Sequence, residues 1–220
     1  MGLTVSDHNV VGNGGTSIFG IVPGTDGSSP SEDNVGNNRE YFATPTDARK
    51  PASELSLSYK GTELLKNYES YKQYPYNDNP DVKKANATIG YGDLLHYGPI
   101  NAQDKKDYPN GITKEEATTR LQFKLAPYEN VVKTNVTRKL YQYEYDALVL
   151  FQYNTHGLVG STLLKRVNAN ETADKITEGF LMFNKITNRE TKKKEVSTGL
   201  TNRRTDEAEL FNTGDYIRNH

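Results

Sequence analysis

The chain contains no cysteine and no tryptophan among its 220 residues. Without cysteine, a disulfide framework, a thiolate metal site and a thiol nucleophile are excluded, while the redox compartment stays open. No apolar run is long enough to span a bilayer, so no integral membrane segment is expected. The first fifteen residues also lack a basic segment followed by an apolar one, which argues against a standard secretory signal peptide. The composition therefore predicts a soluble protein with a core in one or two domains.

The sequence also lacks an excess of charge of one sign, because its net charge is −1. Residues 1–53 carry three basic and six acidic side chains, or −3, and residues 54–220 carry 24 basic and 22 acidic ones, or +2. This weakly cationic second part suits approach to an anionic polymer such as a cell wall. It provides no basic stripe with interleaved aromatic residues, so nucleic acid is not expected as a partner.

The amino-terminal stretch has little apolar content. Residues 1–36 hold 8 of the 18 glycines, mixed with Ser, Asn, Asp and Thr, and cannot bury a core by themselves. We interpret this stretch either as a flexible leader or as a docking arm whose two short apolar patches add to the surface of a partner. Pro45 and Pro51 then indicate a linker, so the predicted leader covers residues 1–53 and the predicted folded domain covers 54–220.

A helical pattern begins after Ser58, a typical N-cap residue, and ends near Glu69. Gly61 permits a close approach of a neighbouring element. One face carries the apolar residues Leu64, Leu65 and Tyr68. Glu69 lies at the negative end of the helix dipole and beside this buried face, and both conditions disfavour its charged form. We therefore expect Glu69 to keep a proton that it can donate to a leaving group.

A second carboxyl group follows in a segment with strand character. Residues 71–95 are rich in Tyr, Thr and Ile and are interrupted by turn residues, including the tetrapeptide at 77–80 and Gly90, so they predict a small antiparallel sheet. Asp78 lies in this turn region. Two carboxyl groups that face each other across a cleft suit the cleavage of a glycosidic bond.

Helices are predicted for most of the remaining chain. The sequence from Thr113 to Glu116 is typical of a capping box, and Pro127 is expected to kink or restart the helix that follows. The most apolar run, residues 145–152, predicts the central core helix. Further helices are expected over residues 161–167, 171–183 and 200–212. His96 and His156 have no second histidine or carboxylate at metal-ligand spacing, so no metal site is predicted.

Several segments match one known family in the same order. The first are Glu69, Asp78 and the motif from Thr88 to Gly92, which together resemble the catalytic helix and hairpin of the T4-type phage lysozymes, glycoside hydrolase family 24. The similarity continues through residues 146–149, 151–152, 161–165, 183–185 and 199–207, and it covers about residues 58–216.

The resemblance implies an α+β, mainly helical, two-lobed fold, with a small antiparallel sheet lobe joined by a long helix to a larger helical lobe. It also implies a muramidase that needs no cofactor or metal and cleaves the β-1,4 bond between N-acetylmuramic acid and N-acetylglucosamine in bacterial peptidoglycan. By the same resemblance Glu69 is the general acid, Asp78 activates water or steadies the oxocarbenium-like centre, and Thr88 positions that water. Phe151 and Gln152 lie where the family contacts sugar. The retaining or inverting outcome stays open, because it depends on the carboxyl separation.

Three positions depart from the family pattern. The interval between Asp78 and Thr88 is longer than the usual tight hairpin. Ser70 replaces the glycine that commonly follows the catalytic Glu. Asp93 stands where the motif usually ends in histidine, so the ion pair that this histidine often makes should be absent or reversed.

Three settings fit such a protein. It is either a phage enzyme made in the host cytoplasm, for lysis or for wall penetration from the virion, or a toxin delivered to rival bacteria and paired with an immunity protein. In the third setting it is an inactive peptidoglycan-binding or structural component of a larger assembly. In the first two, residues 1–53 would contact a tail, virion or delivery apparatus, and the protein would act in the cell wall or periplasm.

Overall fold

The computed structural model describes residues 48–188 and 191–219. All described residues belong to one compact unit, Thr44–His220. The predicted leader falls outside the described residues over positions 1–47.

The described residues form a mainly helical structure with two small antiparallel sheets, and the predicted fold class is confirmed. The α-helices are α1 Tyr59–Glu69, α2 Ala102–Asp107, α3 Lys114–Asn135, α4 Gln142–Thr155, α5 Thr162–Asn168, α6 Ala173–Leu181 and α7 Thr198–Thr213. The strands are β1 Lys72–Asn77, β2 Ala87–Gly90 and β3 Asp93–His96 in one sheet, and β4 Lys185–Thr187 and β5 Lys194–Val196 in the other. Two short 3-10 helices cover Ala52–Glu54 and Val82–Lys84.

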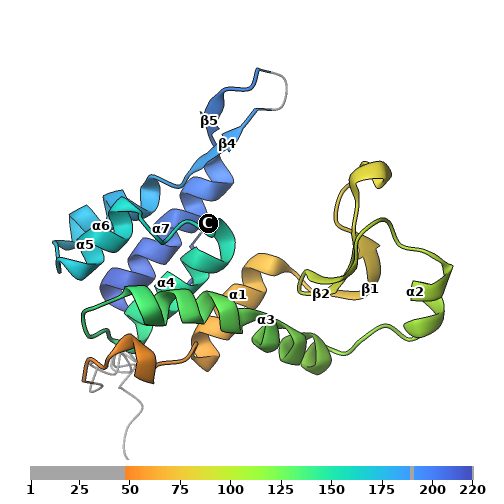
Figure 1. Ribbon diagram of the computed structural model, residues 1–220, viewed down its shortest axis with the longest axis horizontal. Helices are drawn as coiled ribbons and strands as arrows, with labels where there is room; N and C mark the ends of the chain where they lie inside the picture. The colour runs from red at the N-terminus through yellow and green to blue at the C-terminus, as the bar shows by residue number, and fades with distance from the viewer. Residues whose placement is uncertain (1–47, 189–190, 220) are drawn as a thin grey trace, which may run out of the picture. The chain divides into compact units, whose positions relative to one another are not determined.

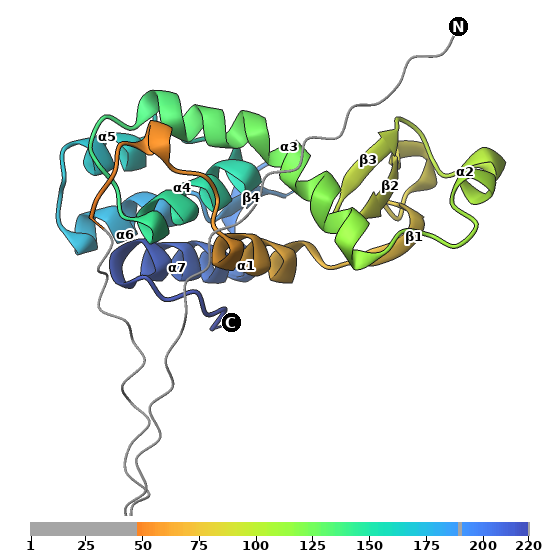
Figure 2. The same cartoon turned by 90° about the horizontal axis from the view of Figure 1, so that it is seen from below.

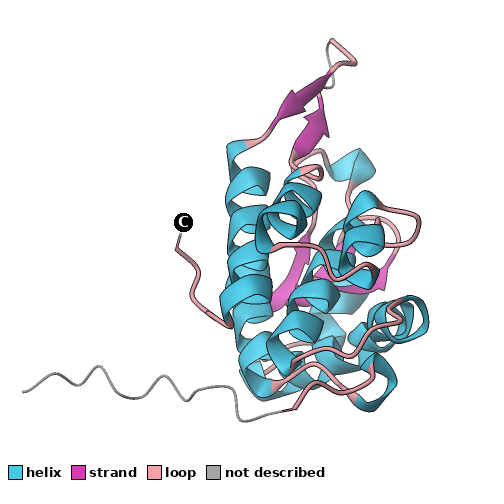
Figure 3. Ribbon diagram, turned by 90° about the vertical axis from the view of Figure 1, so that its left-hand side faces the viewer, coloured by secondary structure: helices cyan, strands magenta, loops and turns pink. Residues whose placement is uncertain are grey.

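The sheet β1-β2-β3 and α2 lie at one end of this unit, and α4, α5, α6 and α7 lie at the other (Figures 1 and 2). Helices α1 and α3 run between these two parts, and α3 contacts the sheet as well as α4. The β4–β5 hairpin projects beyond the helices (Figure 3). We call the first part the sheet lobe and the second part the helical lobe.

Local signals explain where the helices begin and end. The Ser58 hydroxyl accepts a hydrogen bond from the Gly61 amide at 3.0 Å, as an N-cap should. Thr113 and Glu116 form the predicted capping box at the start of α3. Pro127 lies inside α3, which continues through it to Asn135, so the predicted restart is wrong. Because the first four amides of a helix have no partner in the helix, such caps determine its starting point.

Helix α4 forms the centre of the helical lobe. Its residues from Glu144 to Tyr153 are buried in an unbroken run, which confirms the predicted core helix. It packs against α7, α3 and α1, and α3 contributes Ala117, Leu121, Leu125 and Val132 to the same core. A helix that is enclosed on all sides shows no amphipathic stripe, so most of this run is apolar, and Glu144, Asp146 and Gln152 are its buried polar residues.

One buried carboxylate joins α4 to the start of α1. Asp146 accepts hydrogen bonds from the Ser58 amide at 3.1 Å and from the Tyr216 hydroxyl at 2.7 Å, and also from the Ser58 hydroxyl. Burial raises the pKa of Asp146, while these hydrogen bonds oppose the rise. A Cβ atom at Gly61 would lie 2.9 Å from Cγ of Asp146, so the predicted close approach at Gly61 is confirmed.

Part of the predicted linker belongs to the folded unit. Lys50 and Leu140 exchange two backbone hydrogen bonds of 2.8 Å, and Arg49 forms an ion pair of 3.2 Å with Glu144 on α4. Ala52 is 2% exposed. The structured region therefore begins before residue 53, because the chain ahead of α1 completes its hydrogen bonds on the helical lobe.

Two truncated proteins test this boundary. A protein that starts at residue 48 is expected to be about 2–3 kcal/mol more stable to unfolding than one that starts at residue 54, because the shorter protein loses two backbone hydrogen bonds, an ion pair and the burial of Ala52. Urea denaturation of both proteins gives the difference. Equal free energies of unfolding for the two proteins would place the start of the folded domain after residue 53, as the sequence predicts.

Candidate active site

Glu69 is the last residue of α1, as predicted, and its side chain is 23% exposed. Its Oε1 atom accepts a hydrogen bond of 3.3 Å from Nη1 of Arg203 on α7. The local sequence predicted the helix end and partial burial of Glu69 but not its contact with this arginine, which stands 134 positions further along the chain. A guanidinium in this position orients the carboxyl group.

Asp78 follows the last residue of β1 and is exposed. Asn86 binds both of its carboxylate oxygens, with the backbone amide at 2.7 Å and the side-chain amide at 3.1 Å, and the Asp78 amide donates to the Asn86 carbonyl at 3.1 Å. These three hydrogen bonds close the base of the long loop 79–85, which contains the 3-10 helix Val82–Lys84. The extra loop residues therefore leave the strand pairing beyond Asn86 in place.

Tyr76 on β1 is the common neighbour of the predicted catalytic residues. Burial raises the pKa of Tyr76, and the negative charges of Asp78 and Glu69 raise it further. Thr88 on β2 is its partner in the strand register. The Thr88 side chain is 5% exposed, and its hydroxyl donates a long hydrogen bond of 3.4 Å to the Asn86 carbonyl. Tyr76 therefore pairs with Thr88 in the sheet and is affected by the charges of Asp78 and Glu69.

Tyr153 on α4 belongs to the helical lobe and is affected by the charge of Glu69. Burial raises the pKa of Tyr153, and the charge of Glu69 raises it further, while Arg203 opposes the rise. Both lobes therefore contribute side chains to the surroundings of Glu69.

Phe151 and Gln152, the predicted sugar contacts, are both buried on α4. Phe151 is 0% exposed and makes edge-to-face contacts with Phe180 and Phe183, at centroid distances of 5.4 and 4.9 Å. Gln152 is 6% exposed, and its Oε1 accepts from the Leu158 amide at 3.0 Å. A ring with no exposed surface cannot stack on a sugar in this conformation, so the structure gives Phe151 a packing role and Gln152 a loop-anchoring role.

Ser70, which replaces the usual glycine, ends α1 with φ 57° and ψ 131°. A positive φ with this ψ is unfavourable for residues that carry a Cβ atom and is readily adopted by glycine. The bend follows directly after Glu69, so it sets the direction in which the chain leaves the helix and enters β1.

Replacing Ser70 by Gly is expected to raise the free energy of unfolding by about 1 kcal/mol, because the strain relieved exceeds the entropy that glycine adds to the unfolded chain. Thermal and urea denaturation measure the change. Ser161→Gly serves as the control, since Ser161 has φ −70° and caps α5, and this substitution should give no gain. Unchanged or lower stability for Ser70→Gly would show that the bend carries little strain.

The ion pair at position 93 was expected to be absent or reversed, and the structure shows it reversed, with Asp93 as the negative partner. Its Oδ2 atom lies 3.1 Å from Nη1 of Arg120 on α3. The carboxylate is on β3 and the cation is on the long helix, so the pair ties the sheet to α3. The guanidinium of Arg120 also donates to the Tyr108 hydroxyl at 3.4 Å.

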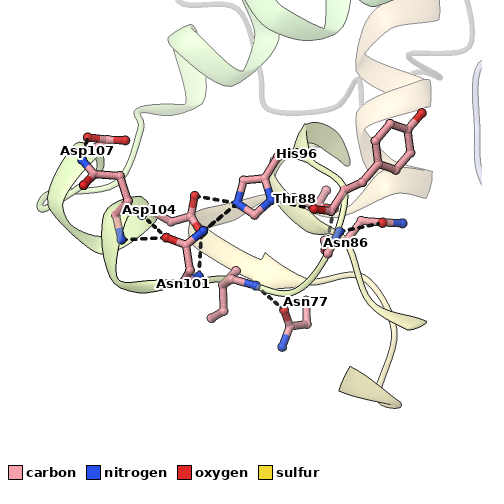
Figure 4. A network of polar contacts seen from close by, with 11 residues as sticks. Asn77, Asn86, Thr88, His96, Asn101, Asp104 and Asp107 are labelled. Atoms are coloured by element: carbon pink, nitrogen blue, oxygen red, sulfur yellow. Dashed lines mark hydrogen bonds and ion pairs between the residues drawn. The ribbon is translucent and has the colours of Figure 1, made fainter. Parts of the chain in front are cut away.

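A polar network holds α2 against the sheet (Figure 4). His96 on β3 places Nε2 at 3.0 Å from both carboxylate oxygens of Asp104, and its Nδ1 lies 3.0 Å from the Tyr97 carbonyl. Asn101 caps α2 and also contacts His96 at 3.2 Å. The Tyr97 carbonyl and Asp104 raise the pKa of His96, and the Asn101 amide and His96 lower that of Asp104.

This network makes stability depend on pH. Because the pKa of His96 is raised, the folded state binds the His96 proton more tightly than the unfolded chain does. The stabilisation of the folded state by protonated His96 is therefore complete below about pH 6.5, and it is lost as pH rises through the raised pKa. The contribution of Asp104 is lost only when pH falls below about 4. His96→Gln should therefore cost more stability at pH 5.5 than at pH 8.5, as urea denaturation can measure. Equal costs at the two pH values would contradict this linkage.

Within residues 48–188 and 191–219, no group of three or more His, Cys, Asp or Glu side chains could hold a metal ion. The helices of this part also include none that is long and apolar enough to span a membrane.

Residues 66–207 match the family described as phage lysozyme, and this match covers more than half of the chain. The chain belongs to the phage lysozyme family. The endolysin of Bacillus phage PZA is 31% identical over 162 residues, which are 73% of this chain and 56% of that protein. The chain therefore spans just over half the length of this relative.

Solved structures of the same type agree with the fold. The endolysin from Escherichia coli O157:H7 phage FAHEc1 is 30% identical with a TM-score of 0.62, covering 74% of this chain and 98% of that one. The muramidase domain of SpmX from Asticaccaulis excentricus is 27% identical with a TM-score of 0.58, covering 71% and 97%. The phage lysozyme match contains Glu69, Asp78 and Thr88, and also Arg203 and Glu207, which sequence reasoning did not place in the site.

Proposed function

We propose that this chain is a peptidoglycan hydrolase, a muramidase that cleaves the β-1,4 bond between N-acetylmuramic acid and N-acetylglucosamine. The observation that carries the proposal is Glu69 at the end of α1, bound by Arg203 of the helical lobe, with Asp78 after β1 and Thr88 on β2 of the adjoining sheet. Family membership supports the same activity, since the relatives include endolysins and a muramidase domain.

Each residue has a separate part in the proposed reaction. Glu69 donates its proton to the glycosidic oxygen as the bond to the departing sugar breaks. Asp78, held by two hydrogen bonds from Asn86, faces the positive charge that develops on the sugar or activates the attacking water. The Thr88 hydroxyl orients that water. Arg203 holds the carboxyl group of Glu69 in place from the helical lobe.

We further propose that the protein is a phage lysozyme used for lysis or for wall penetration, because the relatives named above include phage endolysins. A toxin with an immunity partner would use the same chemistry. An inactive wall-binding component would share the fold alone.

Product analysis tests the activity itself. Purified peptidoglycan is incubated with the protein, and the soluble fragments are reduced with borohydride and analysed by mass spectrometry. Fragments that end in reduced N-acetylmuramic acid are expected. Fragments ending in reduced N-acetylglucosamine would reassign the bond that is cut. Sedimentation of the protein with intact peptidoglycan, without any release of fragments, would favour the inactive component.

A further inference from the structure

Arg203 is shared between two carboxyl groups. Its Nη1 donates to Glu69 at 3.3 Å, while its Nε donates to Oε1 of Glu207 at 3.2 Å, one helical turn further along α7. The same Oε1 atom accepts from Nη2 of Arg204 at 2.7 Å. A continuous chain of contacts therefore runs from Glu69 to the interior of the helical lobe.

The inner end of this chain is completely buried. Arg204 and Glu207 are both 0% exposed. Arg204 is held in place by Oδ1 of Asn154 on α4 at 2.9 Å, and its guanidinium carbon lies 5.2 Å from the centre of the Phe151 ring. Because packing and hydrogen bonds fix these side chains, Glu207 provides a rigid anchor for Arg203.

The charges of this cluster do not cancel. Two guanidiniums, those of Arg203 and Arg204, face one buried carboxylate, Glu207. Nη2 of Arg203, Nε and Nη1 of Arg204 and Oε2 of Glu207 are buried without a hydrogen-bond partner among the residues that the structure describes. Glu207 is therefore the carboxyl group that both guanidiniums share, and Glu69 lies at the outer end of the cluster.

We infer that Glu207 is a positioning residue of the proposed hydrolase: it holds Arg203 against Glu69 and offsets part of the positive charge that the two arginines place beside the Glu69 carboxyl group. The inference rests on the proposed function. Arg203 and Glu207, four positions apart on α7, then have a role beyond packing. Glu207 is completely buried and does not touch the substrate, so it acts through Arg203.

Other charged groups around the cluster are accounted for. The charge of Glu69 raises the pKa of Tyr76 on β1 and of Tyr153 on α4. Tyr68 on α1 lies under the Arg203 guanidinium at 4.5 Å, donates to Asp206 at 2.9 Å and faces Arg218 at 5.2 Å. The charged residues of α6, which also packs on α7, are exposed: Asp174, Lys175 and Glu178. Burial raises the pKa of Glu207, and both guanidiniums oppose the rise.

The pH dependence of peptidoglycan hydrolysis tests the inference. Activity falls on the basic side when the general acid loses its proton. In Glu207→Gln the cluster beside the proposed general acid gains positive charge, so the basic limb of the activity profile should move to lower pH by about one unit. In Arg203→Gln the cluster loses positive charge, and the limb should move by a similar amount in the opposite direction. Arg203→Lys keeps the charge and should stay close to the wild type.

Glu209→Gln is the matched control, because Glu209 is on the same helix and contacts Asn219 outside the cluster. Thermal unfolding of each variant identifies the pH range in which it is folded. If Glu207→Gln does not fold, Arg203→Gln and Arg203→Lys decide the outcome, since Arg203 is less buried than Glu207.

Opposite shifts of the basic limb support the inference. A limb that stays in place in Arg203→Gln, or that moves the same way in Glu207→Gln and Arg203→Gln, overturns it. A limb that stays in place in Glu207→Gln also overturns it, because Glu207 would then already be protonated in the wild type. A wild-type protein that releases no fragments at any pH refutes the proposed function instead, so the two failures are distinguishable.

Discussion

Replacing Glu69 by Gln should lower the rate of peptidoglycan clearing by a factor of at least about 100, which is the usual contribution of a general acid. Gln has nearly the same shape and can still accept the hydrogen bond from Arg203, but it has no proton to donate to the glycosidic oxygen. The loss should therefore affect the chemical step with little effect on folding. The measurement is the fall in turbidity of a peptidoglycan suspension, with thermal unfolding as the check on structure.

Glu63→Gln provides the control for this experiment. Glu63 is on the same helix and pairs with Lys66 near the surface, so its loss should leave the clearing rate unchanged. Equal clearing by wild type and Glu69→Gln would remove Glu69 from the reaction. No clearing by either protein would leave the inactive wall-binding component as the better explanation of the fold.

Replacing Phe151 by Ala should lower the free energy of unfolding by about 3–5 kcal/mol. The ring is completely buried, and it contacts Phe180, Phe183 and the guanidinium of Arg204, so its removal leaves a cavity that these neighbours cannot easily fill. Since the free energy of unfolding of a small domain is only about 5–15 kcal/mol, this loss would be a large fraction of the total. Urea denaturation measures the loss.

Phe123→Ala is the matched control, because Phe123 on α3 is 80% exposed and its removal should change stability little. The result also separates the two roles considered for Phe151. A variant that unfolds at the wild-type urea concentration but clears peptidoglycan slowly would contradict the packing role and restore the predicted sugar contact.

The helices with strong local signals could be predicted closely from the sequence. Ser58, the capping box from Thr113 to Glu116, and Gly214 with φ 77° mark ends of α1, α3 and α7 within one or two residues of those expected. Helix α2 was missed because its six residues show no apolar pattern, and it is held instead by Asn101 and by the contact of Asp104 with His96. The β4–β5 hairpin was missed for a similar reason, since its strand residues are all exposed.

The residues of the candidate site also divide into those that local sequence signals predicted and one that they did not. Glu69, Asp78 and Thr88 were found because they lie within twenty residues of one another and follow a recognisable order, and their catalytic roles stay predictions. Arg203 was missed because ordinary charged residues on a distant helix carry no local sign of which carboxylate they will meet.

The sequence by itself determined the fold class, most of the helices, the family and the three residues proposed for catalysis, because caps, turns and short motifs act over a few neighbouring positions. Only the tertiary structure decided that Phe151 is enclosed, that residues 49–52 belong to the folded unit, and that Arg203 links Glu69 to the buried Glu207. Burial and ion pairing depend on which segments meet in space, and Glu69 and Arg203 are separated by 134 positions in the chain.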